Sequence, residues 1–205
     1  MDLIAVSPKM LSKSIDFNLI KKEEDKDFFG SLFLVAGAIG NDITCENLSS
    51  LGDLSKRTAE IIKIVGGEVE ERKKSVKARR KAIMQGINIS CAGIEEILPF
   101  IALLCAFCTG ESRLNGVRDT KYISLLKATA SEFSHLGIFT EQTSDGLIIH
   151  GGQTFAGDGA YVWNSASLAM ALLMGAGRSE GEVRIFGIEG ICDKRFEDFL
   201  KLTIL

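Results

Sequence analysis

The feature that most constrains this chain is an internal repeat of about 69 residues. An apolar helix pattern, a glycine and a short strand pattern follow one another three times along the sequence. Setting Leu34 against Leu103 and Leu172 gives two equal offsets of 69 residues. The glycine that ends each helix pattern recurs at Gly40, Gly110 and Gly181. A period of this size indicates three copies of one supersecondary unit, so we expect a threefold assembly.

The three expected units are residues 15–83, 84–156 and 157–205. The first two each predict a strand, an apolar helix, a second strand, an amphipathic helix and a closing hairpin, which is a β-α-β-α-β-β order. The third unit has no hairpin of its own. We expect the N-terminal residues 1–14 to complete it, which makes residues 1–205 a single domain.

The helix patterns predict how these units pack. The apolar helices, expected at residues 28–39, 94–108 and 165–176, are apolar nearly all round and therefore belong inside the protein. Asp25 or Asp27 is expected to cap the first of them, and Ser55 to cap the first amphipathic helix. The predicted fold class is α/β, with buried helices inside and short-stranded sheets outside. If the buried helices are parallel, their N-termini meet on one face and attract anions.

Composition and charge exclude several classes of protein. The formal charge of −3 gives no general attraction to nucleic acid or membranes. The uncharged stretches are shorter than the roughly 20 residues of a membrane helix, and residues 1–10 lack the pattern of a secretory signal. Five cysteines, an odd number, indicate reduced thiols. We therefore expect a cytoplasmic protein that does not insert into a membrane.

Several short motifs, in a fixed order, carry a family resemblance. They begin with Gly110-x-x-Arg113-Leu114-x-Gly116-Val117 and Lys121, and continue with Glu132-Phe133-x-x-Leu136-Gly137, Asp145-Gly146-Leu147-Ile148-Ile149, the run 167–172 and Lys194-Arg195-Phe196-x-Asp198-Phe199. From about Ile15 onward the chain resembles the C-terminal domain of the 5-enolpyruvylshikimate-3-phosphate synthase (3-phosphoshikimate 1-carboxyvinyltransferase) family. Members of that family carry two such domains, which close on substrate between them.

The resemblance implies an activity and a set of site residues. It implies transfer of the enolpyruvyl group of phosphoenolpyruvate to shikimate 3-phosphate, in the pathway to aromatic amino acids, without a cofactor. Glu96 matches the catalytic aspartate of the family, and Lys121 matches the lysine of a Lys-Glu-x-Asp-Arg motif. Lys194 matches a lysine that contacts phosphoenolpyruvate. A complementary N-terminal domain, or a second copy of this chain, is the expected partner.

Other motif positions have changed. The Lys-Glu-x-Asp-Arg motif has become residues 121–125, Lys-Tyr-Ile-Ser-Leu, and the Asp-His-Arg triplet has become Ser165-Ala166-Ser167. Both arginines that hold phosphoenolpyruvate are therefore missing, together with one acid, so we expect weak activity or none. The three retained residues also have ordinary explanations. Lys121 suits a surface helix, Glu96 suits the positive end of a helix dipole, and Lys194 suits the polar start of a helix.

Two further features have alternatives to a functional role. Seven basic residues between positions 72 and 81 lie on the first predicted hairpin, which is usual for a solvated loop but also suits an anion or nucleic-acid patch. No aromatic residue lies among them, so single-strand binding is not expected. The pair Cys105-x-x-Cys108 falls within an apolar helix without a second pair, and the two histidines lack metal-ligand spacing, so no metal site is expected. Three hypotheses remain: an enolpyruvyl transferase domain, a non-catalytic relative that binds small anions or assembles with a partner, and a nucleic-acid-associated protein.

Overall fold

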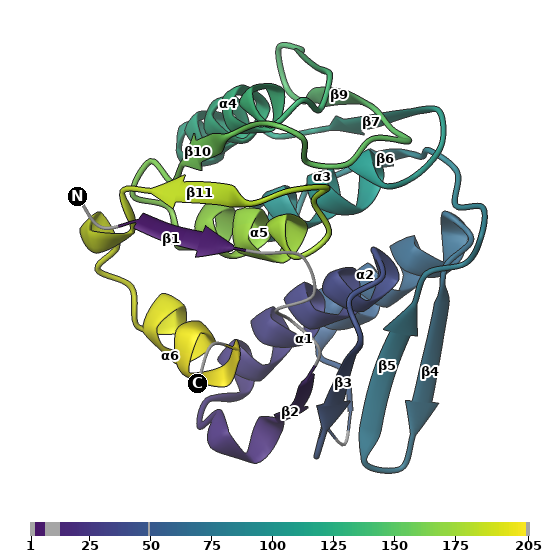
Figure 1. Cartoon of the computed structure of the whole chain (residues 1–205). Coiled ribbons are helices and arrows are strands. Elements are labelled where there is room, and N and C mark those ends of the chain that lie inside the picture. The colour runs from purple at the N-terminus through teal and green to yellow at the C-terminus, as the bar shows by residue number, and fades with distance from the viewer. Residues whose placement is uncertain (1–2, 7–12, 49, 204–205) are drawn as a thin grey trace.

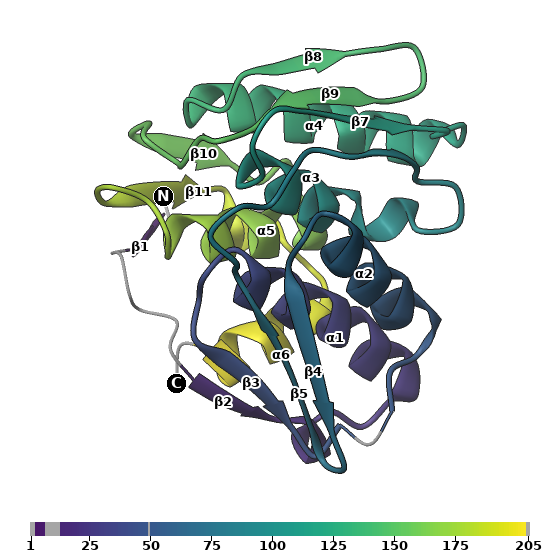
Figure 2. The same ribbon diagram turned by 90° about the vertical axis from the view of Figure 1, so that its right-hand side faces the viewer.

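Three small sheets surround a group of helices (Figures 1 and 2). The structure is a computed structural model that describes residues 3–6, 13–48 and 50–203. One sheet has the order β2-β3-β5-β4, with β2 at Lys13–Asp16, β3 at Ile43–Glu46, β4 at Glu68–Arg72 and β5 at Ser75–Arg79. A second has the order β6-β7-β9-β8, with β6 at Asn88–Ser90, β7 at Glu111–Asn115, β8 at Thr140–Gln142 and β9 at Leu147–His150. The third has the order β1-β11-β10, with β1 at Leu3–Val6, β10 at Gly159–Tyr161 and β11 at Val183–Phe186.

The strand pairings repeat from sheet to sheet. In each of the three, the first strand of the unit is parallel to the second, as β2 is to β3, β6 to β7 and β10 to β11. The second strand then pairs antiparallel with a third, which is β5 in one sheet and β9 in another. In the third sheet β1 takes that position, with Leu3 opposite Phe186. The N-terminal segment therefore supplies one strand to the third sheet, whereas the sequence predicted a hairpin from residues 1–14. Strand β2, which begins at Lys13, pairs in the first sheet instead, and residues 1–2 and 7–12 lie outside the described residues.

Three apolar helices form the centre of the fold. They are α1 (Glu23–Ala38), α3 (Leu98–Ala106), which follows the 3-10 turn η2 (Glu95–Ile97), and α5 (Ala166–Ala176). Every residue of α3 is buried, as is α1 from Phe28 onward and α5 from Leu168 onward. The rings of Phe28 and Phe100 meet edge to face at 5.3 Å, which joins α1 to α3. The predicted arrangement of helices inside and sheets outside is confirmed.

The amphipathic helices cover this centre. They are α2 (Asp53–Ile64), α4 (Thr120–His135) and α6 (Lys194–Thr203), and two more 3-10 turns lie at Phe17–Leu19 (η1) and Ile188–Gly190 (η3). On α4, for example, Leu126, Thr129 and Phe133 are buried while Lys121 and Lys127 are exposed, which is the stripe that an amphipathic helix presents to a core. None of the helices in the described ranges combines the length and apolarity needed to cross a membrane.

Both predicted helix caps are wrong, and the two errors have one cause. Helix α1 begins a turn earlier than its apolar pattern, after Lys22, and no side chain caps it. Asp27 therefore lies inside α1, where its carboxylate accepts hydrogen bonds from the backbone N–H groups of Leu54 (2.9 Å) and Ser55 (2.8 Å) in the first turn of α2. Ser55 is a buried residue of α2 whose hydroxyl also donates to Asp27 (2.5 Å). The cap of α2 thus comes from the neighbouring helix.

Two further boundaries differ from the sequence prediction. The alternating pattern of Ile15, Phe17 and Leu19 predicted one strand, but β2 ends at Asp16, whose carboxylate accepts from the N–H of Asn18 and starts a 3-10 turn. Leu19 consequently points outward and is 70% exposed. The second buried helix begins at Leu98 rather than Ile94, because η2 replaces its first turn. These local turns shorten the elements without changing their order.

Candidate functional site

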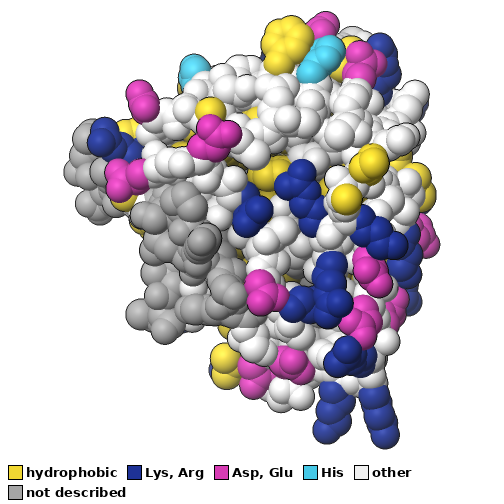
Figure 3. All heavy atoms as spheres, turned by 45° about the vertical axis from the view of Figure 1, so that its right-hand side comes forward, with side chains coloured by type: hydrophobic (Ala, Val, Ile, Leu, Met, Phe, Trp, Pro, Cys, Tyr) yellow, Lys and Arg dark blue, Asp and Glu magenta, His cyan; other side chains and the backbone are white. Residues whose placement is uncertain are grey.

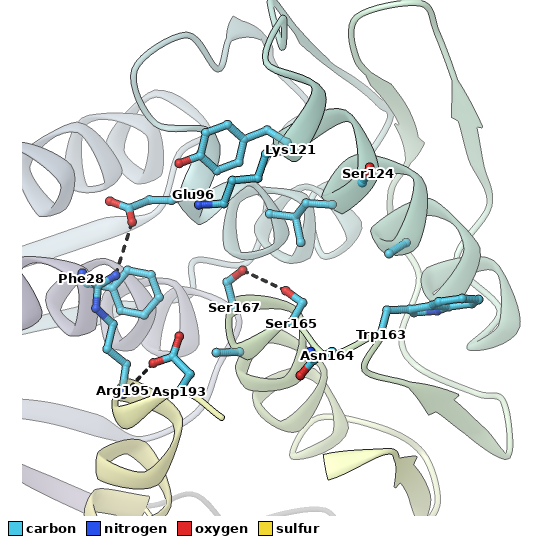
Figure 4. Close-up of a pocket in the computed structure, with 14 residues that line it drawn as sticks. Phe28, Glu96, Lys121, Ser124, Trp163, Asn164, Ser165, Ser167, Asp193 and Arg195 are labelled. Atoms are coloured by element: carbon cyan, nitrogen blue, oxygen red, sulfur yellow. Dashed lines mark hydrogen bonds and ion pairs between the residues drawn. The ribbon is translucent and has the colours of Figure 1, made fainter. Parts of the chain in front are cut away.

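A cavity of about 480 Å³ lies where the buried helices begin (Figure 4). Its wall includes Phe28 of α1, Glu96 of η2 and the serines at the start of α5. Helix α4 forms one side, and the start of α6 contributes Arg195. The starts of η2 and α5 therefore meet at one cavity, whereas α1 reaches it with Phe28, beyond its own first turn.

The start of α5 is the part of this wall best suited to an anion. Ser165 caps the helix, with its hydroxyl accepting a hydrogen bond from the N–H of Leu168 (3.3 Å). The N–H groups of Ala166 and Ser167 precede the first intrahelical bond, which Ala169 donates to the carbonyl of Ser165. The first turn of α5 contains no acidic residue, whereas the first turn of α1 contains three and η2 contains two. The positive end of the helix dipole is therefore least compensated at α5.

Lys121 supplies a positive charge to the same cavity. It lies in the first turn of α4, which Asp119 caps by accepting from the N–H of Lys121 (2.9 Å). Its side chain extends toward the side of the cavity where Glu96 lies (Figure 4), and its Nζ is 5.1 Å from the centre of the Tyr122 ring. Within the described part of the chain, no carboxylate forms an ion pair with Lys121. This ammonium group can therefore pair with a ligand.

Arg195 also lines the cavity, but carboxylates already hold it. Its Nε donates to Asp25 on α1 (2.8 Å), and its Nη1 lies 3.3 Å from Glu96 on η2. The guanidinium also lies 4.6 Å from the ring centre of Phe28. Burial would lower the pKa of Arg195, but the hydrogen bond to Asp25 and the charge of Glu96 outweigh it and leave the pKa raised. Arg195 thus ties α6 to α1 and η2.

The structure separates the three residues predicted for the site. Glu96 and Lys121 both line the cavity, whereas Lys194 is not part of its wall. Lys194 is exposed and donates to Asp198 one turn further along α6 (2.6 Å), and this hydrogen bond is the main reason that its pKa is raised. Its neighbour Arg195 faces the cavity instead, with its N–H donating to Asp193, the residue before α6 (2.8 Å).

The changed motif positions also meet in this cavity. Tyr122, Ser124 and Leu125 of α4 line one side, and the triplet Ser165 to Ser167 lines the other. Sequence reasoning missed Arg195, Trp163 and Asn164. Trp163 is the only tryptophan of the chain and lies two positions before the altered triplet, which is the signal that could have identified it.

The cysteines do not form a second site. Cys45, Cys91, Cys105 and Cys108 are buried, and burial raises the pKa of each thiol to about 12. Such thiols stay protonated and unreactive at neutral pH. Among the residues that the structure describes, no group of histidine, cysteine and acidic side chains could hold a metal ion.

The basic run is partly neutralised on its own hairpin. Arg72 and Arg79 both pair with Glu70, at 2.7 and 3.5 Å, and Lys77 pairs with Asp42 at 2.5 Å. Figure 3 shows acidic side chains interspersed with Lys and Arg over this side of the molecule. The pattern is that of a solvated charged surface.

The fold indicates the class of protein to which the chain belongs, and the sequence then indicates the family within that class. The structure resembles the enolpyruvyl transferase NikO from Streptomyces tendae, with a TM-score of 0.67 and 16% identity over 85% of this chain and 41% of that one. It also resembles EPSP synthase from Acinetobacter baumannii, with a TM-score of 0.65 and 22% identity over 84% of this chain and 44% of that one. At such identities these likenesses show the fold alone, which is that of an enolpyruvyl transferase domain.

A sequence model of EPSP synthase (3-phosphoshikimate 1-carboxyvinyltransferase) matches residues 30–202, so the chain belongs to that family. The 3-phosphoshikimate 1-carboxyvinyltransferase of Clostridium acetobutylicum is 34% identical over 82% of this chain and 40% of its own length. The enzyme of the same name from Methanocaldococcus jannaschii is 31% identical over 80% of this chain and 40% of its own length. The chain therefore spans about 40% of the curated relatives it matches.

Proposed function

We propose that this chain is one domain of an enolpyruvyl transferase and that its cavity binds the anionic groups of the substrates. The observation that carries the proposal is that Lys121 lines the same cavity as the start of α5, whose first turn contains no acidic residue. A lysine and free backbone N–H groups are both suited to phosphate and carboxylate. Phosphoenolpyruvate and shikimate 3-phosphate, which the family uses, are the proposed ligands.

The proposed roles differ among the site residues. In this proposal Lys121 binds the anion, and Glu96, which lines the same cavity, moves a proton to or from the acceptor hydroxyl. Lys194 was predicted to bind substrate, and it would have to leave Asp198 and turn toward the cavity to do so. Arg195 is the nearer cation, but it would have to exchange Asp25 or Glu96 for a ligand.

The missing arginines set the expected strength of binding. A charge-assisted contact of this kind contributes about 1.5–3 kcal/mol, so losing two weakens binding by roughly two to four orders of magnitude. We therefore propose weak binding and little or no turnover for the chain alone. A non-catalytic relative that binds small anions remains the second candidate, favoured by the same losses at positions 125 and 167.

We also propose the setting in which this domain acts. Residues 1–205 form one domain of three units, and a complementary N-terminal domain, or a second copy of this chain, covers the cavity. The five free thiols support a cytoplasmic location for the protein.

The test is a titration followed by NMR chemical shifts, which detect millimolar affinities. Phosphoenolpyruvate and shikimate 3-phosphate are added to the chain with and without a separately supplied N-terminal domain, and phosphate release is measured in parallel. Shifts at Lys121 and at residues 165–167 are expected for at least one ligand. If neither ligand shifts these signals under either condition, the proposal fails.

Three variants assign the binding. Lys121→Ala is expected to weaken binding about tenfold or more, because it removes the one unpaired ammonium group of the described cavity wall. Lys127→Ala, an exposed lysine on the same helix outside the cavity, is the matched control and should bind normally. Lys194→Ala tests the sequence prediction directly, since equal loss in Lys121→Ala and Lys194→Ala would mean that Lys194 turns inward when ligand binds.

A further inference from the structure

The start of α5 follows a tight turn with an unusual backbone. Ser165, which caps α5, donates its backbone N–H to the carbonyl of Val162 (2.8 Å), and this hydrogen bond closes a four-residue turn. The two residues between them, Trp163 and Asn164, have positive φ values of 50° and 54°. Asparagine tolerates this left-handed region, whereas a bulky residue such as tryptophan rarely adopts it. Such a conformation persists only where the surrounding structure imposes it.

The contacts that hold this turn come from Glu132 on α4, which is 1% exposed. Its Oε1 accepts a hydrogen bond from the indole Nε1 of Trp163 (2.6 Å), and its Oε2 accepts from the backbone N–H of Tyr161 (2.8 Å). Oε2 also lies 3.2 Å from Nδ1 of His135. Burial of a carboxylate is costly unless hydrogen bonds replace its water, and these partners do so. Two of them directly precede the start of α5 in the chain.

Glu132 holds the backbone that enters the turn as well as the indole. The N–H of Val162 donates to the carbonyl of Phe186 in β11 (3.1 Å), whereas the N–H of Tyr161, one residue earlier, donates to Glu132 on α4. Glu132 therefore takes the outer edge of β10, which is the outermost strand of its sheet. The indole of Trp163 points away from the start of α5 (Figure 4), so its bond to Glu132 acts on α5 through the backbone of the turn.

Through these bonds Glu132 connects the two parts of the anion site. Helix α4 carries Lys121 in its first turn and Glu132 near its end. The N–H groups of Ala166 and Ser167, which precede the first intrahelical bond of α5, follow the turn directly. Among the described residues, the hydrogen bonds between α4 and residues 159–167 are both made by Glu132. The place of the α5 N-terminus relative to the helix of Lys121 therefore depends on this one side chain.

We propose that Glu132 is a positioning residue for the anion site, because it fixes the left-handed turn at Trp163 and Asn164 and so directs the N–H groups at the start of α5 into the cavity. This inference rests on the anion site proposed above and adds a residue that acts on the site without touching the ligand, since Glu132 is not part of the cavity wall. Misplacing one of these N–H groups loses a charge-assisted hydrogen bond, which weakens anion binding about tenfold.

A substitution at Glu132 separates positioning from electrostatics. Glu132→Gln removes a negative charge, which by itself would strengthen the binding of an anion. It also places an amide donor opposite one of the two N–H groups that Glu132 accepts, so positioning predicts weaker binding. Glu141→Gln, which removes the charge of an exposed acid on β8, is the matched control.

Phosphoenolpyruvate is titrated against the whole chain and followed by NMR shifts at Lys121 and at residues 165–167. The affinity is expected to fall about tenfold in Glu132→Gln and not to fall in Glu141→Gln. An unchanged or higher affinity in Glu132→Gln overturns the inference and leaves the anion site intact. Absence of binding to the parent chain overturns the anion site and the inference together.

Two substitutions at Trp163 test the turn while Glu132 stays in place. Trp163→Ala and Trp163→Gly lose the same indole and the same bond to Glu132, but only glycine adopts positive φ without strain. The glycine variant is therefore expected to bind phosphoenolpyruvate about fivefold more tightly than the alanine variant. A purely structural role predicts equal binding by the folded proteins, because both variants lose the same contacts. Equal affinities of the two variants, measured well below their urea unfolding midpoints, overturn the inference.

Discussion

The carboxylate of Asp27 joins two helices, and its removal should be costly. It accepts three hydrogen bonds at the start of α2, from the N–H groups of Leu54 and Ser55 and from the hydroxyl of Ser55. Loss of a helix cap costs about 1–2 kcal/mol. The buried Ser55 hydroxyl would keep only the carbonyl of Gly52, at 3.4 Å, and a poorly satisfied buried group costs about 1–3 kcal/mol.

Asp27→Ala is therefore expected to lower the free energy of unfolding by about 2–5 kcal/mol, measured by equilibrium urea unfolding. Asp27→Asn should lose about half of that, because its amide group presents a donor where one carboxylate oxygen accepted. Asp53→Ala is the matched control, since Asp53 is an exposed acid in the first turn of the same helix and should cost less than about 1 kcal/mol. If Asp27→Ala costs no more than Asp53→Ala, the cap between helices does not stabilise the fold as described.

Three other predictions concern packing and thiols. Gly37→Ala should destabilise the fold by about 1–3 kcal/mol in urea unfolding, because the added Cβ would lie 2.5 Å from the carbonyl oxygen of Ala78. A variant as stable as the parent protein would refute this close contact. A thiol reagent should label only Cys192 in the folded protein and all five cysteines in denaturant, as measured by mass spectrometry. Labelling of a second cysteine in the folded protein would contradict the burial of the other four thiols. Burial raises the pKa of Cys105 from 9.0 to about 12, so the thiol of the unfolded state loses its proton at a lower pH than the thiol of the folded state. The free energy of unfolding should therefore fall as the pH rises above 9, by up to about 1.4 kcal/mol per pH unit. Cys105→Ala should remove that part of the slope, and an unchanged slope would show that this thiol does not contribute.

The fold was predictable because its strongest signals are long and periodic. The three apolar helices and the repeat offset indicated both the buried centre and the order of elements. Element ends were less predictable, because they depend on contacts between segments. Asp27 lies near the start of an apolar pattern and looks like a cap for its own helix, yet packing directs it to the start of the next helix. A single sequence contains no signal for that choice.

The site was predictable only where motifs mark it. The positions at 96, 121–125 and 165–167 were found through motifs, and the cavity contains Glu96, Lys121 and the three residues of the triplet. Arg195 was missed because its side chain is held at the cavity by Asp25 and Glu96, two carboxylates that lie far from it in the sequence. Trp163 was missed because its orientation depends on left-handed backbone angles and on a carboxylate 31 positions earlier.

The pairing of β1 with β11 has a consequence for the order of folding. Leu3 pairs with Phe186 and Val6 with Val183, so β1 is separated from its partner strand by the sequence of both other sheets. The sheets of the first two units are each complete within a short stretch of chain, whereas the third must wait for β11 to leave the ribosome. Because contacts so distant in sequence form slowly, we expect closure of this sheet to be the late, rate-limiting event in the maturation of the protein.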